Sequence, residues 1–173
     1  KKAIRAGVTG TNGKSTTTAM LGHLLECAGR KVATGGNLGE PYAKLVLTRP
    51  DAEYFVLELS SYQLESLQHV RLNTAVYLNL TPDHLDRHKT IEAYAEAKAR
   101  IFANQGADDH AIFNADDEAA AVAALGSPAR AWPFSQTREI PGGGYYRGSV
   151  AFGRDERLFD FARLKVVGAP NMQ

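Results

Sequence analysis

The residues best suited to chemistry lie close to the N-terminus, in the run Gly10-Thr11-Asn12-Gly13-Lys14-Ser15-Thr16. A short strand candidate, residues 4–8, precedes this run, and a predicted helix over residues 15–28 follows it. A glycine-rich turn at a helix N-terminus directs several backbone N–H groups and the positive end of the helix dipole at one point. Such a point attracts phosphate. The run therefore predicts an ATP site in which Lys14 reaches the β- and γ-phosphates and Ser15 coordinates Mg²⁺.

The glycine spacing departs from the standard phosphate-loop pattern, which requires a glycine where this chain has Val8. Glycines occur instead at Gly7 and Gly10. The alternative interpretation is a Gly-Lys-Ser run that begins an ordinary helix by chance. The predicted strand before the run and the helix after it favour a true phosphate loop, residues 10–15.

A second candidate is Glu58, which ends the unbroken apolar run 54–57. Such a run is typical of a strand covered on both faces in a parallel sheet, and α/β sheets bind ligands at the carboxyl ends of their strands. A carboxylate in that place can hold Mg²⁺ beside a phosphate loop. The alternative is an ordinary acidic side chain at a strand end, facing solvent.

The third candidate region is Asp83-His84-Leu85-Asp86-Arg87-His88, which follows another apolar strand candidate. His84 could be a metal ligand, a base or a polar loop residue. Lys98 lies on the next predicted helix and is by default a solvated lysine. Spacing alone does not distinguish it from Lys89 or Arg100.

Strand and helix patterns alternate along most of the chain. Strands are predicted at 4–8, 31–34, 54–57, 75–80 and 111–113, and helices at 15–28, 63–68, 91–104 and 116–125. This alternation indicates right-handed βαβ crossovers and an α/β fold of three layers around a mostly parallel sheet. Short strand patterns near the C-terminus predict a small antiparallel β annex. We expect a single domain over 1–173, with an α/β core over 1–132 and the annex over 133–173.

The composition is that of a soluble globular protein, with 44% hydrophobic and 23% charged residues. Twenty basic and nineteen acidic side chains leave a net charge of +1, which gives no reason to expect a nucleic-acid or membrane partner. The single cysteine, Cys27, lies on the first predicted helix. We expect a buried thiol in a protein of the reducing cytoplasm.

Several motifs, in this order, resemble the Mur ligases. They are Gly10 to Thr18, Gly36-Asn37-Leu38-Gly39, Glu58-Leu59-Ser60-Ser61-Tyr62-Gln63-Leu64-Glu65, Asn79 to His88, and Tyr94 to Ile101. Members of that family have an N-terminal UDP-binding domain, a central ATPase domain and a C-terminal domain for the incoming amino acid. The resemblance covers the central domain, so we expect this chain to be one part of a longer enzyme.

The resemblance also implies roles for individual residues. It implies that Lys14 binds the γ-phosphate and that Ser15 and Glu58 hold a first Mg²⁺. His84 would be a ligand of a second metal, and Lys98 matches the lysine that the family converts to a carbamate with CO₂. A carbamate replaces a cation with carboxylate-like oxygen atoms, which suit Mg²⁺.

For the substrates, the resemblance implies that Asn37, Ser60 and Gln63 lie at or near the UDP-muramoyl compound. Asn171 resembles an adenine-contacting asparagine, although Pro170 occupies the position of the histidine in that motif. The run from Glu58 to Glu65 after the Gly-Asn-Leu-Gly turn favours the members that add D-glutamate. The implied substrates are ATP, UDP-N-acetylmuramoyl-L-alanine and D-glutamate, and the implied enzyme is a cytoplasmic monomer.

Three alternatives remain at this point. A folylpolyglutamate synthase shares the loop and the type of reaction. A phosphate-loop switch protein would usually carry a guanine-reading Asn-Lys-x-Asp pattern, which this sequence lacks. An isolated nucleotide-binding module without ligase activity is a further interpretation, and we expect this chain by itself to be inactive in ligation.

Overall fold

The computed structural model describes residues 2–83, 85–147, 150–154 and 156–160, and the strands of this part form one sheet. The strands are β1 (Ile4–Thr9), β2 (Val32–Gly36), β3 (Tyr54–Glu58), β4 (Thr74–Tyr77), β5 (His110–Asn114), β6 (Arg130–Phe134), β7 (Gly144–Arg147), β8 (Val150–Gly153) and β9 (Glu156–Asp160). The helices are α1 (Lys14–Cys27), α2 (Tyr42–Thr48), α3 (Ser61–Ser66), α4 (Leu85–His88), α5 (Ile91–Ala99), the 3₁₀ turn η1 (Arg100–Phe102) and α6 (Glu118–Leu125).

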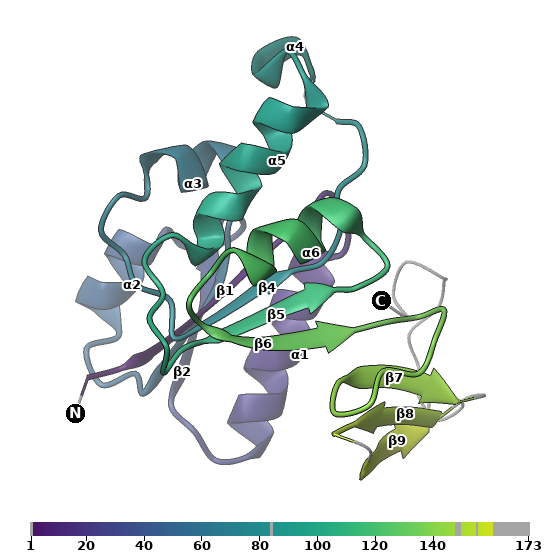
Figure 1. Ribbon diagram of the computed structural model, residues 1–173. Helices are drawn as coiled ribbons and strands as arrows, with labels where there is room; N and C mark the ends of the chain where they lie inside the picture. The colour runs from purple at the N-terminus through teal and green to yellow at the C-terminus, as the bar shows by residue number, and fades with distance from the viewer. Residues whose placement is uncertain (1, 84, 148–149, 155, 161–173) are drawn as a thin grey trace.

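The strand order is β2-β3-β1-β4-β5-β6-β7-β8-β9. The pairs from β2 to β7 are parallel, and β7, β8 and β9 pair antiparallel beyond them (Figure 1). The predicted α/β class, with a mostly parallel sheet and antiparallel strands near the C-terminus, is confirmed. Strand β6 was not predicted, and it crosses the expected boundary between residues 132 and 133.

The helices divide between the two faces of the sheet. Helix α1 lies on one face, while α2, α3, η1 and α6 contribute to an apolar core on the other (Figure 1). Among the largest contributors to that core are Leu57, Leu64, Tyr77, Phe102 and Phe113. Because α1 follows β1 and α5 follows β4, the connections from these adjacent strands leave toward opposite faces. Open α/β sheets bind ligands at the carboxyl ends of strands whose connections diverge in this way.

The side chains that helix α1 buries differ from those expected from the sequence. Its buried residues are Thr18 and Gly22, whereas Leu24 is 62% exposed and Cys27 is also exposed. A Cβ at Gly22 would lie 2.5 Å from the Thr34 hydroxyl, so the glycine lets the helix approach β2 closely. That close approach turns the small residues toward the sheet, and the prediction of a buried Cys27 was wrong.

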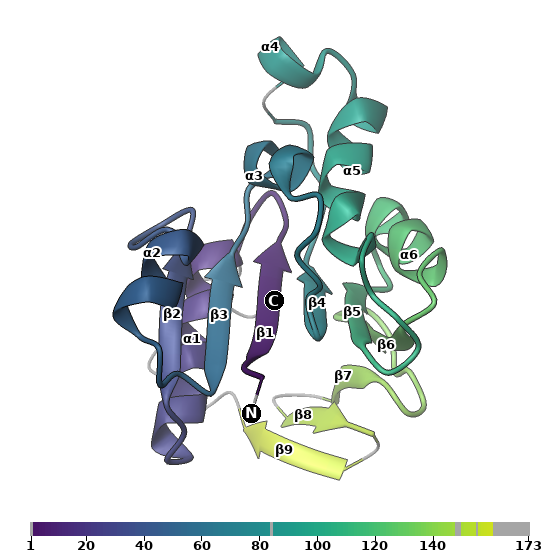
Figure 2. The same cartoon turned by 90° about the vertical axis from the view of Figure 1, so that its left-hand side faces the viewer.

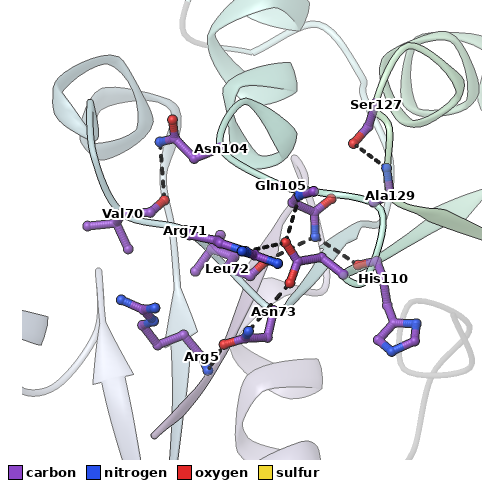
Figure 3. Close-up of polar contacts among 12 residues, drawn as sticks. Arg5, Val70, Arg71, Leu72, Asn73, Asn104, Gln105, His110, Ser127 and Ala129 are labelled. Atoms are coloured by element: carbon purple, nitrogen blue, oxygen red, sulfur yellow. Dashed lines mark hydrogen bonds and ion pairs between the residues drawn. The ribbon is translucent and has the colours of Figure 1, made fainter. Parts of the chain in front are cut away.

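The amino ends of the parallel strands are joined by buried polar contacts (Figure 3). Asp109, 1% exposed, accepts hydrogen bonds from Arg71 Nε at 2.6 Å and the Gly106 backbone N–H at 2.8 Å. Asn73 donates to the same carboxylate, and its own oxygen accepts the Arg5 backbone N–H at 3.1 Å. The network therefore ties β1, β4 and β5 together at the edge of the sheet opposite the carboxyl ends of these strands.

Asp109→Asn is expected to lower the free energy of unfolding by about 2 kcal/mol at neutral pH, because charge-assisted hydrogen bonds to a buried acceptor are lost. Burial raises the pKa of Asp109, but the bonds from Arg71 and Gly106 outweigh it and hold the pKa below 3.8. A depressed pKa means that this stability is present above the unfolded value and is lost as pH falls through the folded value. Denaturant unfolding from neutral to acidic pH measures the effect.

The matched control is Asp108→Asn, because Asp108 is the preceding residue and its side chain is 90% exposed. Its substitution should change stability by less than about 0.5 kcal/mol. Equal effects of the two substitutions would contradict the structural role of Asp109.

Candidate nucleotide-binding site

Three parallel strands bring the candidate residues to one edge of the sheet. The phosphate loop follows β1, Glu58 ends β3, and Asn79 follows β4 shortly after its last residue. Strand β1 pairs with β3 on one side and with β4 on the other (Figure 2). Residues far apart in sequence therefore meet around the loop.

The phosphate loop has the backbone geometry that its glycines permit. Gly10 has φ 154° and Gly13, the N-cap of α1, has φ 83°, both unfavourable for side-chain-bearing residues. The first intrahelical bond joins the Thr17 N–H to the Gly13 carbonyl. An α-helix leaves its first N–H groups without intrahelical partners, so the start of α1 is suited to binding an anion.

Lys14 folds back over the loop that it belongs to. Its Nζ donates to the backbone carbonyls of Gly10 and Thr11, each at 2.9 Å. Burial lowers the pKa of Lys14, while the negative charges of Glu58 and Asp83 act in the opposite direction. The ammonium group therefore lies among the loop atoms, with carboxylates near enough to influence it.

Lys98 reaches the same loop from α5. It is 1% exposed, its Nζ donates to the Gly10 carbonyl at 2.7 Å, and the Nζ lies 4.5 Å from the centroid of the Tyr94 ring. Burial, reinforced by the positive charge of Lys14 and opposed by Asp83, lowers the pKa of Lys98 from 10.5 to about 7. Lys98 is therefore not the solvated lysine of the default interpretation. A substantial fraction of this amine is neutral near physiological pH.

Glu58 is buried, with 3% of its surface exposed. Its Oε1 accepts a hydrogen bond from Asn37 Nδ2 at 2.9 Å, and the Asn37 backbone N–H donates to the Glu58 carbonyl at 2.8 Å. Its Oε2 is buried and has no hydrogen-bond partner among the residues that the structure describes. The solvent-facing interpretation of Glu58 was therefore wrong. An uncompensated carboxylate oxygen is costly to bury, and a cation bound beside it would remove that cost.

Three of the remaining candidate residues lie in the described part of the structure, and two lie outside it. Ser15 is exposed at the start of α1. Ser60 and Gln63 form a capping box at the start of α3, in which the Ser60 N–H donates to Gln63 Oε1 at 3.0 Å. His84 and Asn171 lie outside the described residues.

Buried aromatic and imidazole groups line the neighbourhood of Lys98. His88 is 7% exposed, its Nε2 lies 3.0 Å from the Ser61 hydroxyl oxygen, and its ring centroid lies 5.0 Å from that of Tyr94. These contacts join α3, α4 and α5. They fix the helix that carries Lys98 relative to the strand that carries Glu58.

Two polar residues of the site were not selected from the sequence. Asp83 was noted only as part of a motif, yet it faces the charges of Lys14 and Lys98. Asn79 was assigned to the interior of a strand over 75–80, whereas β4 ends at Tyr77. A polar residue placed directly after a buried apolar run was the available signal for Asn79.

Protein side chains alone provide few metal ligands here. Within the described ranges, no group of three or more His, Cys, Asp and Glu side chains is arranged to hold a metal ion. A cation bound at Glu58 would therefore need further oxygen atoms, for example from Ser15, from phosphate or from a modified side chain. The described helices also include none that is long and apolar enough to cross a membrane.

Known proteins resemble this chain in both sequence and fold. A family model described as the Mur ligase middle domain matches residues 8–165. Over 99% of its length the chain is 41% identical to UDP-N-acetylmuramoylalanine–D-glutamate ligase of Geotalea daltonii, and it spans 39% of that relative's length.

Two solved structures have a similar fold. The structure of a UDP-N-acetylmuramoyl-L-alanyl-D-glutamate–2,6-diaminopimelate ligase superposes with a TM-score of 0.70 and 26% sequence identity. The match covers 91% of this chain and 39% of the ligase chain. The E. coli FolC structure in complex with DHPP and ADP has a TM-score of 0.70 and 18% sequence identity. The match covers 97% of this chain and 50% of the FolC chain. The second likeness supports the fold alone.

The family model covers most of the chain, and the Geotalea relative covers nearly all of it. Together with the shared fold, these matches establish that the chain belongs to the Mur ligase family, through its middle domain.

Proposed function

We propose that this chain is the ATP-binding part of a ligase that joins D-glutamate to UDP-N-acetylmuramoyl-L-alanine. Its main support is the meeting of the phosphate loop, Glu58 and Lys98 at one edge of the sheet. The name of the Geotalea relative supports the choice of substrates. The FolC likeness alone does not favour a folate substrate, because at 18% identity it extends to the fold only.

In this proposal, the reaction takes place in two steps. A carboxylate oxygen of UDP-N-acetylmuramoyl-L-alanine attacks the γ-phosphorus of ATP, forming an acyl phosphate and releasing ADP. The amine of D-glutamate then attacks the acyl carbon, loses a proton and displaces inorganic phosphate, which leaves an amide. ATP is needed because an unactivated carboxylate is a poor acyl donor.

The chain's own residues position and neutralise the phosphates. The N–H groups at the start of α1 receive phosphate oxygens. Lys14 exchanges its bonds to the Gly10 and Thr11 carbonyls for bonds to the β- and γ-phosphates. Phosphoryl transfer depends mainly on such positioning and charge stabilisation.

The residues at the edge fit a magnesium ion. Glu58 Oε2 is a buried oxygen of the type that Mg²⁺ prefers and has no hydrogen-bond partner in the described part of the chain, and Ser15 supplies a hydroxyl at the helix start. Mg²⁺ bound there would neutralise charge that develops on the phosphate oxygens. Asn37 holds the other Glu58 oxygen and so keeps the carboxylate in place.

We further propose that Lys98 forms a carbamate. Its neutral amine would attack CO₂, forming an N–C bond and releasing one proton. The pKa of about 7 supports this step, because a substantial fraction of the amine is neutral at physiological pH. The product carries two oxygen atoms beside the loop, where no group of three or more His, Cys, Asp and Glu side chains among the described residues is arranged to hold a metal ion.

Lys14→Ala in the full-length protein is expected to reduce formation of ADP at least about 100-fold, because a charge that stabilises the transferring phosphoryl group is removed. The assay supplies ATP, Mg²⁺, UDP-N-acetylmuramoyl-L-alanine and D-glutamate. Lys31→Ala is the control, since this lysine is exposed and pairs with Asp51. Unchanged ADP formation by the Lys14 variant would contradict its role, and turnover only with a folate and glutamate would contradict the substrate assignment.

The carbamate is tested by ¹³C NMR of the protein in ¹³C-bicarbonate. We expect a carbamate resonance in the wild type that is absent from Lys98→Arg. No resonance in the wild type under turnover conditions would contradict the carbamate proposal while leaving the ATP site untouched.

A further inference from the structure

The side chain of Asn79 is bonded to the backbone of the phosphate loop. Its Oδ1 accepts hydrogen bonds from the Asn12 N–H at 2.8 Å and the Thr11 N–H at 3.0 Å. Its Nδ2 donates to the Asn12 carbonyl at 3.1 Å, and its backbone carbonyl also accepts from the Thr11 N–H at 2.9 Å. Asn79 is 8% exposed, so these bonds form where water has little access.

The contact continues the pairing of β1 with β4 beyond the ends of both strands. The Leu78 N–H donates to the Thr9 carbonyl at 3.0 Å. A Cβ at Gly10 would lie 3.0 Å from Leu78 Cβ and 3.3 Å from the Asn79 nitrogen, so the two segments touch directly. Thr11 and the Thr81 backbone add a second link, in which the Thr81 N–H donates to Thr11 Oγ1 at 3.0 Å.

These bonds determine which loop amides are available to a ligand. The Thr11 and Asn12 N–H groups point to Asn79 and not to the centre of the loop. The start of α1 is then the part of the loop region suited to receive phosphate. An asparagine suits this task because one carboxamide supplies both an acceptor and a donor to adjacent peptide groups.

We propose that Asn79 is a positioning residue that holds the phosphate loop in its nucleotide-accepting conformation. Without its side chain, the Asn12 N–H and carbonyl lose their partner and the Thr11 N–H keeps only the backbone carbonyl of residue 79. The loop must then be ordered when the nucleotide binds. The cost of that ordering weakens nucleotide binding. This inference rests on the proposed ATP site and adds a residue that touches no reacting atom.

The chain offers a matched control at the other end of β4. Asn73 precedes this strand, and its Oδ1 accepts the Arg5 N–H just as Asn79 Oδ1 accepts loop amides (Figure 3). Asn73 also donates to the buried Asp109. Both asparagines join the β4 segment to the β1 segment, but only Asn79 does so at the phosphate loop.

The test compares Asn79→Ala and Asn73→Ala in the full-length protein. Without nucleotide, hydrogen–deuterium exchange of a peptide covering residues 9–14 is expected to be at least about 5-fold faster in Asn79→Ala and unchanged in Asn73→Ala. Titration with ATP and Mg²⁺ is expected to give a Kd about 10-fold higher for Asn79→Ala, and within about 2-fold of the wild type for Asn73→Ala. Both variants are expected to have a lowered Tm.

Equal Kd values for the two variants would overturn the proposal, as would unchanged exchange in Asn79→Ala. If Asn79→Ala does not fold, Asn79→Asp retains the acceptor oxygen and is expected to keep slow exchange of residues 9–14. Fast exchange in that variant would also overturn the proposal. A wild type that does not bind ATP would contradict the proposed function, and the exchange measurements would still decide whether Asn79 orders the loop.

Discussion

Glu58→Gln is expected to lower kcat of the full-length ligase about 100- to 1,000-fold and to weaken its dependence on Mg²⁺. The substitution keeps the size of the side chain and an oxygen that can accept the bond from Asn37 Nδ2. It removes the negative charge and the buried Oε2, which no described residue hydrogen-bonds and which fits a cation. The expected loss therefore arises from the metal site and not from a change of fold.

The same substitution is expected to stabilise the ligand-free protein by about 1 kcal/mol, since a neutral amide is cheaper to bury than a carboxylate without a full set of partners. Lower activity together with a higher Tm separates a metal-binding role from a structural one. Binding of Mn²⁺ in the presence of ATP, followed by electron paramagnetic resonance, gives a readout independent of turnover.

Glu53→Gln is the control, because Glu53 immediately precedes β3 whereas Glu58 ends it. Glu53 is exposed, and its carboxylate accepts the Lys31 backbone N–H at 3.2 Å. We expect nearly unchanged kcat for this variant. A Glu58→Gln enzyme with wild-type kcat and Mg²⁺ dependence would contradict the assignment.

The sequence predicted the elements whose patterns are local. An apolar run of strand length and a glycine-rich turn before a helix are both readable from neighbouring residues, and β1, α1 and β3 were found in this way. Strand β6 was missed because Pro133 lies within it, and proline disfavours central strands. Here the register pairs Pro133 with β5, while β7 meets β6 only at Phe134.

The part of the site formed by neighbouring residues could be predicted from a sequence motif. The part formed by residues far apart in the sequence could not. The phosphate loop positions Lys14 and Ser15 within a few residues, so its prediction needed no tertiary information. The burial of Lys98 depends on α5 packing over the loop, which no local pattern encodes. The contact between Asn79 and the phosphate loop could not be predicted for the same reason, because its partners Thr11 and Asn12 are 68 and 67 residues away.

Lys98→Met is expected to abolish ligation. It is also expected to raise the free energy of unfolding of the ligand-free protein by about 2 kcal/mol at pH 6.5 or below, because replacing a buried charge by an apolar group of similar volume often stabilises a protein by this amount. Lys98 is buried, and its Nζ shares the Gly10 carbonyl with Lys14. Methionine fills a similar volume without a charge. The Gly10 carbonyl keeps Lys14 as a donor, so no buried acceptor is abandoned.

The stabilisation should depend on pH in a defined direction. The pKa of Lys98 is lowered to about 7 in the folded protein, from 10.5, so the unfolded chain binds this proton more tightly. Below about pH 7 the lysine is charged in both states and the cost of burying the charge is fully present. As pH rises above 7 the folded protein releases the proton, the cost declines, and the wild type approaches the stability of the variant.

Denaturant unfolding of both proteins between pH 6 and 9, in CO₂-free buffer, measures this difference. Lys89→Met is the control, because Lys89 is exposed and precedes α5, the helix that carries Lys98. Its substitution should change the free energy of unfolding by no more than about 0.5 kcal/mol at every pH. A Lys98→Met protein that is less stable than the wild type below pH 7 would show that the buried ammonium stabilises the loop. An active variant would remove Lys98 from the proposed mechanism, because methionine can form no carbamate.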